Sequence, residues 1–184
     1  MQADLREVRL LHELLGLLLK SMSELADLLE RFRRGPELLA VATTGASNPE
    51  LDYVAEVGVW SARQIVCHLA DSEVVGVDRF RRTIAENNPT IMGYDEKAWA
   101  ENLDYGRRKL SHALETFRLI RGDNYALLKE LPEETFARPC THSERGPLTL
   151  LDLLRIYAEH AENHSKQILQ ARQKYKEARA EGRL

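Results

Sequence analysis

The chain has few of the features that mark disulfide-rich, secreted or membrane proteins. Only two of its 184 residues are cysteine, Cys67 and Cys140, and they form no C-x-x-C motif. This excludes a disulfide framework and indicates a reducing cytoplasm. The longest uncharged run of the apolar N-terminal segment spans residues 14–19, far short of the roughly 20 residues of a membrane helix. Because that segment also has no basic start and no small-residue cleavage site, we expect no signal peptide and no membrane partner.

An excess of charge of one sign is also missing. The 26 Lys and Arg residues nearly balance the 29 Asp and Glu residues, so the formal net charge is −3 and the isoelectric point is near 6.1. Nucleic-acid binding usually needs a clustered basic surface, so we expect no nucleic-acid partner. Contents of 43% apolar and 30% charged residues are ordinary for a soluble globular protein. The length suits one domain that covers residues 1–184.

No segment shows the alternation typical of a β-strand, whereas several show the three- and four-residue spacing of an amphipathic helix. Four such segments have the length of bundle helices, so we predict an all-α four-helix bundle. The connections are longer than a minimal bundle needs, which predicts at least one crossover. The predicted helices cover about residues 4–33, 61–87, 107–131 and 149–181, with a short helical piece near 95–102.

Turn and capping residues set the expected helix ends. The Gly35-Pro36 pair should stop the first helix, and the residues from there to Val59 then form a long connection. Ser61 followed by Gln64 predicts a capping box at the start of the second helix. Thr149 should open the fourth helix, whose highly charged end should protrude or fray.

Two histidines of the fourth helix lie on its apolar stripe. His160 and His164 are four residues apart, so their side chains should stack on one helical face about 5–6 Å apart, and this face also carries Leu153, Tyr157 and Ile168. Two imidazoles at this spacing can bind one metal ion. The alternative is that each ring is a buried polar group that hydrogen-bonds to a carbonyl or hydroxyl oxygen.

The second helix offers a third ligand. His68 lies on its inner side and could face His160 and His164 across the bundle. Three neutral histidines leave at least one coordination position open, which is typical of a catalytic metal site. The sequence lacks the residues that two other metal motifs require: a zincin needs His-Glu-x-x-His, and a di-iron bundle needs paired Glu-x-x-His motifs. Neither occurs.

The remaining candidates have weaker patterns. We expect His12 and His112 to be surface or boundary residues. His142 reads as a plain loop residue, although it could sit at the mouth of a cavity. Cys67 points about 100° away from the neighbouring His68 around the helix, so we expect it to be a small core residue and not a metal ligand.

Three stretches carry a family resemblance: WSARQIVCHLADSE, NPTIMGYDEKAWAE and GPLTLLDLLRIYAEHAENHSKQI. Through them the chain resembles the DinB-like superfamily of bacterial four-helix-bundle proteins, which includes YfiT-like metal-dependent hydrolases and the bacillithiol and mycothiol S-transferases. The resemblance implies an up-down-down-up bundle and places the metal triad of the family on His68, His160 and His164. It also implies a divalent ion, nickel or zinc in the first place and iron or manganese as alternatives.

Two kinds of function follow. As a metal-dependent enzyme, the protein would activate a water or a low-molecular-weight thiol co-substrate, and would act on a small molecule as a hydrolase or thiol S-transferase. Asp71 and Tyr157 are acid/base candidates, but each equally suits a hydrogen-bond partner that orients a ligand imidazole, so no residue is assigned as catalytic. The alternative is a non-catalytic, stress-induced protein that binds a metal or small molecule. A homodimeric state is left open. An enzyme needs an open ligand position facing a cavity of about 300 Å³ or more.

Overall fold

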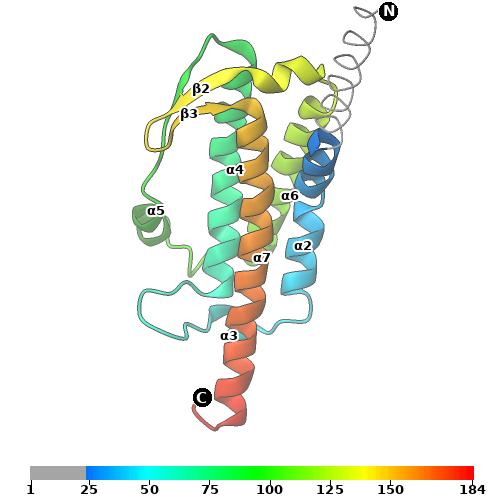
Figure 1. Ribbon diagram of the computed structural model, residues 1–184. Helices are drawn as coiled ribbons and strands as arrows, with labels where there is room; N and C mark the ends of the chain where they lie inside the picture. Colours follow the sequence, from blue (N-terminus) through cyan, green and yellow to red (C-terminus); the bar gives the residue numbers. More distant parts are fainter. Residues whose placement is uncertain (1–23) are drawn as a thin grey trace, which may run out of the picture.

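The computed structural model describes residues 24–184 of the chain. Residues 24–33 are helical, whereas the earlier part of the predicted first helix and His12 lie outside the described residues. The Gly35-Pro36 pair does not stop this helix, because α2 (Gly35–Thr43) follows it after a single turn residue, Arg34 (Figure 1). The proline lies in the first turn of α2, where backbone amides have no helical partner, so its missing N–H leaves no hydrogen bond unmade.

The predicted long connection contains a second short helix, α3 (Asn48–Asp52). Its N-cap is Ser47, whose hydroxyl accepts a hydrogen bond from the amide of Glu50 at 3.4 Å. This helix was not predicted, because five residues are too few to show a periodic pattern.

Three further helices complete the bundle: α4 (Ala62–Ala85), α6 (Leu110–Leu128) and α7 (Leu150–Ala180). In the view of Figure 1, residues 24–43 and α7 run downward while α4 and α6 run upward, which is the predicted up-down-down-up order. Both predicted helix starts are present: α4 begins at the capping box of Ser61 and Gln64, and α7 begins after Thr149, which forms a second capping box with Asp152. The short predicted piece is α5 (Glu96–Asn102), beside α4 and outside the bundle (Figure 1).

A small three-stranded sheet was not predicted. It consists of β1 (Thr90–Ile91), β2 (Pro139–His142) and β3 (Gly146–Thr149), in the order β1-β2-β3, with β1 parallel and β3 antiparallel to β2. A 3₁₀ helix, η1 (Glu133–Ala137), connects α6 to β2. Strands of two and four residues are too short for alternation to stand out. The β2–β3 hairpin projects over the side of α4 and α7 on which α5 lies (Figure 1).

A fully buried ion pair between Glu73 and Arg121 lies inside the bundle. Arg121 also donates hydrogen bonds to the carbonyl oxygens of Phe32 at 3.1 Å and Tyr157 at 3.2 Å. Its guanidinium packs against the rings of Phe32 and Phe117, 4.0 and 4.8 Å from their centres. One side chain therefore connects all four bundle helices, and it sits against the turn of α7 that precedes His160.

The charged end of α7 extends beyond the other bundle helices, as predicted (Figure 1). It does not fray, because α7 is helical to Ala180. Contacts with the α2–α3 region hold the part of α7 where this extension begins. Arg172 pairs with Glu50 at 2.7 Å, and the rings of Tyr53 and Tyr175 lie 5.7 Å apart. Within residues 24–184, no helix combines the length and apolar character needed to cross a bilayer.

Candidate metal centre

The structure brings together the three histidines that the sequence analysis singled out. His68 comes from α4, seven residues after its Ser61 N-cap, and its side chain is fully buried. His160 and His164 come from successive turns of α7 and are half-buried. One ring nitrogen from each residue lies within 4.8 Å of the other two. Helices α4 and α7 are thus packed so that two faces separated by about 90 residues in sequence meet at one cluster.

The rings face one another edge to face. Their centres are 5.0 Å apart for His68 and His160, 4.9 Å for His68 and His164, and 4.5 Å for His160 and His164. The Nε2 atoms of His68 and His160 are only 3.0 Å apart. Two nitrogens that bind one ion with bonds of about 2.0–2.1 Å lie about 3 Å from each other, so this separation fits a shared ion.

Both α7 histidines have a side-chain partner at Nδ1, and one of these partners indicates a tautomer. Nδ1 of His164 lies 2.7 Å from the side-chain oxygen of Gln167; since that oxygen only accepts, Nδ1 carries the proton and Nε2 keeps its lone pair. Nδ1 of His160 lies 3.5 Å from the hydroxyl of Ser72, which can donate or accept and so fits either tautomer of this ring. Neither Gln167 nor Ser72 was predicted as a partner. Their spacing, three residues after His164 and four after His68, was the available signal.

Burial keeps the three rings uncharged at neutral pH. It lowers the pKa of His68 to about 4 and that of His160 to about 2, and in both cases the neighbouring His164 lowers the pKa further. Burial also lowers the pKa of His164. A neutral imidazole has a free lone pair, whereas a protonated one has none. The three residues therefore fit a divalent ion in charge state and spacing.

The two predicted acid/base or orienting residues do not contact the histidines by hydrogen bonds. Asp71 accepts hydrogen bonds from the hydroxyl of Tyr105 and the guanidinium of Arg108, both at 2.8 Å, and Nδ1 of His68 has no partner among the described residues. The hydroxyl of Tyr157 donates to the Ser72 carbonyl oxygen at 3.4 Å. The expectation that these side chains orient a ligand imidazole by a direct hydrogen bond is therefore wrong.

Two of the three remaining candidate residues lie where they were expected, and one does not. His112 is exposed on α6, as expected. Cys67 is a fully buried core residue, also as expected, and burial raises its pKa to about 11. His142 is not a plain loop residue: it lies on β2, is only 5% exposed, and lines a cavity together with His160. The sequence could not show this, because the position follows from the unpredicted hairpin.

Two cavities adjoin the cluster. The first, of about 110 Å³, lies between α4, α7, the β2–β3 hairpin and the segment before α5, and His160 is part of its wall. The second, of about 340 Å³, is lined by Gln167, the partner of His164, and by Trp60, whose ring centre lies 4.9 Å from that of His68. Pockets for drug-sized ligands usually measure about 300–1,000 Å³. The cavity that His160 reaches directly is thus smaller than the roughly 300 Å³ expected for a whole small-molecule substrate, and it suits one end of a substrate.

A four-helix bundle with three histidines converging from two of its helices defines a class of candidate metalloproteins. Comparison with known proteins identifies the family within this class. Residues 31–168 match the model of the DinB superfamily, and the chain belongs to this family.

Relatives in two bacteria carry names that state an activity. A protein of Bacillus subtilis named "Putative metal-dependent hydrolase YfiT" is 34% identical over 130 residues, which cover 70% of this chain and 73% of the relative. A protein of Oceanobacillus iheyensis with the same kind of name is 33% identical over 129 residues, covering 70% and 74%. The solved structure of Bacillus subtilis YfiT matches with a TM-score of 0.76 and 30% identity over 86% of this chain and 87% of that one. Its title describes a "probable metal-dependent hydrolase with an unusual four-helix bundle topology".

Proposed function

We propose that this protein is a divalent-metal-dependent hydrolase that acts on a small molecule and holds its ion through His68, His160 and His164. The observation that carries the proposal is the convergence of three neutral imidazoles, one ligand nitrogen from each within 4.8 Å of the others. The names of the relatives support it. When bound, the ion would lower the pKa of a water molecule and so supply a nucleophile at neutral pH. Imidazole ligands suit zinc, nickel and iron.

The residues around the ligands have separable tasks in this proposal. Gln167 holds the imidazole of His164 in the tautomer that presents Nε2, and the Ser72 hydroxyl contacts Nδ1 of His160 and helps to position that ring. Trp60 covers His68 on one side, and the complete burial of His68 keeps bulk water away from that side of the site. His160 reaches the first cavity, so a substrate group in that cavity would meet the open side of the cluster. The proposed location is the cytoplasm, which is supported by two buried free thiols, Cys67 and Cys140.

Metal analysis of the purified protein tests the ligand set. Wild-type protein prepared without chelator should carry about one divalent first-row ion per chain. His160→Ala should lose most of it, while His112→Ala, which changes an exposed histidine of α6, should keep it. Circular dichroism verifies that each variant is helical. A variant with all three cluster histidines replaced by alanine that still holds the ion at wild-type occupancy would contradict the assignment.

Activity of the loaded protein tests the reaction. Small esters and amides should be hydrolysed by the loaded protein, and chelation should abolish turnover. A parallel screen with bacillithiol, mycothiol, glutathione and coenzyme A as nucleophiles tests thiol S-transfer, because a bound ion activates a thiol as it does a water. A cobalt-substituted protein whose absorption spectrum changes with neither water-mimicking anions nor thiols has no exchangeable position, and it would refute the enzyme in favour of a non-catalytic metal-binding protein.

A further inference from the structure

The wall of the first cavity contains buried polar groups whose hydrogen bonding is incomplete. Arg79 of α4, Tyr94 before α5 and His142 of β2 all line this cavity together with His160. Nε of Arg79 and the hydroxyl of Tyr94 are buried atoms with no partner at hydrogen-bond distance among the described residues, although the Ser72 hydroxyl is near enough to Tyr94 to lower its pKa against the effect of burial. A buried donor left without a partner is destabilising, so an acceptor is expected to occupy this space in the working protein.

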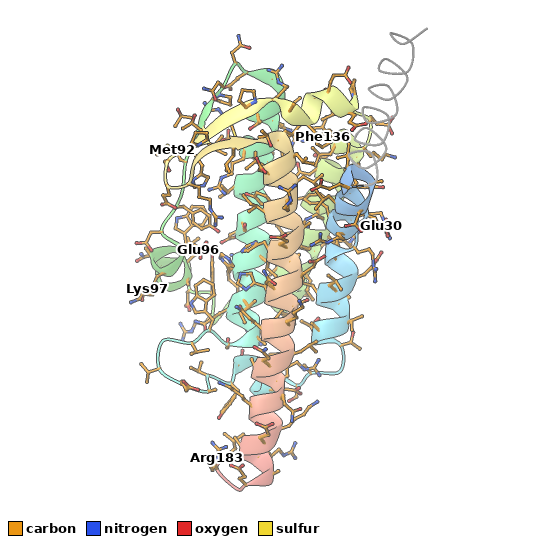
Figure 2. All side chains as sticks on the ribbon, in the orientation of Figure 1. Glu30, Met92, Glu96, Lys97, Phe136 and Arg183 are labelled. Atoms are coloured by element: carbon orange, nitrogen blue, oxygen red, sulfur yellow. The ribbon has the colours of Figure 1, made fainter. Side chains whose placement is uncertain are left out.

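Arg79 is held in place but its charge is not matched. One of its terminal nitrogens donates to the hydroxyl of Tyr157 at 3.2 Å and the other to the carbonyl oxygen of Met92 at 2.5 Å. Both partners are neutral oxygens, and no carboxylate in the described part of the chain forms an ion pair with Arg79. Figure 2 labels Met92 on the segment that leads from the sheet to α5, and Glu96 at the start of α5. The guanidinium is therefore a half-buried, positioned cation beside a cavity.

His142 supplies a further donor. Its Nδ1 accepts a hydrogen bond from the backbone amide of Glu144 at 3.1 Å. Burial and the nearby Arg79 lower its pKa, so the ring is neutral at pH 7. A neutral imidazole that accepts at Nδ1 carries its proton at Nε2. This leaves an Nε2–H as the donor that His142 can offer to the cavity.

The rim of the cavity carries two carboxylates and one guanidinium. Glu96, Glu144 and Arg145 also line the cavity, but all three are exposed. Burial raises the pKa of Glu96, whereas the charges of Arg145 and Arg79 lower it. The carboxylates of the cavity thus lie at its exposed rim, and among the described residues neither forms an ion pair with Arg79.

We propose that this cavity is an oxyanion subsite, in which Arg79, Tyr94 and His142 bind a carboxylate or phosphate group of the substrate. The inference deepens the proposed function, on which it rests for the nearby ion and the reaction. A volume of about 110 Å³ admits such a group and little more, so the rest of the substrate extends past the cavity. Arg79 would supply charge, and the other two residues would supply neutral donors, which is the usual composition of a site for a small oxyanion.

Anion binding to the chelator-treated protein tests the subsite without the metal. Acetate and inorganic phosphate are the probes, acetamide is the neutral comparator, and binding is followed by chemical-shift changes of the tyrosine and histidine rings. At least one anion should bind at least about tenfold more tightly than acetamide, because a charge-assisted hydrogen bond contributes about 1.5–3 kcal/mol. Preference for acetate identifies carboxylate substrates, and preference for phosphate identifies phosphate substrates.

Three variants make the test specific. Arg79→Gln should weaken binding of the preferred anion about tenfold or more. Tyr94→Phe removes a hydroxyl that has no hydrogen-bond partner in the described protein, so it should leave the fold intact and still weaken binding. Arg82→Gln is the matched control: Arg82 is three residues further along α4, pairs with Glu86, and does not line the cavity, so binding should match wild type.

The possible outcomes separate the subsite from the proposed function. Equal affinity for acetate, phosphate and acetamide would overturn the subsite, as would wild-type anion binding by both Arg79→Gln and Tyr94→Phe. Anion binding that appears only after metal loading would place the anion on the ion and overturn it as well. Selective anion binding by a protein that takes up no metal would support the subsite and refute the metalloenzyme.

Discussion

Acidification of the metal-free protein should destabilise it through His68. This side chain is fully buried, and burial lowers its pKa from about 6.5, the value expected in the unfolded chain, to about 4. Between these two values the unfolded chain binds a proton that the folded protein does not bind. The free energy of unfolding therefore falls as the pH decreases from about 6.5 toward 4.

The magnitude follows from the shift. One pKa unit corresponds to about 1.4 kcal/mol, so His68 alone should remove about 3 kcal/mol between pH 7 and pH 4. That is a large part of the roughly 5–15 kcal/mol that stabilises a typical domain. Carboxylates such as Asp152 and Glu162, whose pKa values the fold lowers, also lose stabilisation on acidification, so the effect of His68 must be isolated by comparison.

The assay is urea unfolding with chelator present at a series of pH values for wild type, His68→Gln and His112→Gln. His68→Gln removes the titrating group. Between pH 7 and pH 4 the free energy of unfolding of wild type should therefore fall by about 3 kcal/mol more than that of this variant. His112 is exposed, and its variant should run parallel to wild type. If the free energy of unfolding of His68→Gln also changes with pH in parallel with wild type, the His68 side chain does not have the lowered pKa described here. The same lowered pKa values mean that metal binding should persist below pH 6.5, where an ordinary histidine would already be protonated.

Three further predictions concern the surroundings of the site. Arg121→Met should cost about 3–5 kcal/mol in chemical unfolding because it leaves Glu73 buried and unpaired, and adding Glu73→Leu should recover most of this loss; equal stability of the single and double variants would contradict the account. Gly76→Ala should lower the free energy of unfolding by about 1–3 kcal/mol, because the added Cβ would lie 2.8 Å from the ring of Tyr157. A melting temperature at or above that of wild type would show that α4 and α7 can move apart without loss of stability. Gln167→Ala should weaken metal affinity about 10–100-fold with little change in stability, measured by competition with a chelator; unchanged affinity would mean that the third histidine needs no partner.

Much of the fold and the choice of histidines could be predicted from local patterns. The stripe that carries Leu153, His160 and His164 follows from the helical period, and the structure has this stripe facing the bundle interior. Ser61 and Gln64 set the start of α4 because a capping box involves only residues of the same turn. The same local logic failed at Gly35-Pro36, where the turn is compatible with a second helix beginning at once.

The cavity, by contrast, depends on contacts between distant segments. His142 is brought beside His160 by a hairpin whose strands have at most four residues, and the partners of Arg79 come from α7 and from the residue after β1. Asp71 has the right spacing to orient His68, yet Tyr105 and Arg108 occupy its oxygens. The periodicity of a single sequence determines which face of each helix is buried. Only packing of that face against other segments decides which polar atoms find a partner and which stay free to bind a ligand, because the competing donors and acceptors lie far apart in the chain.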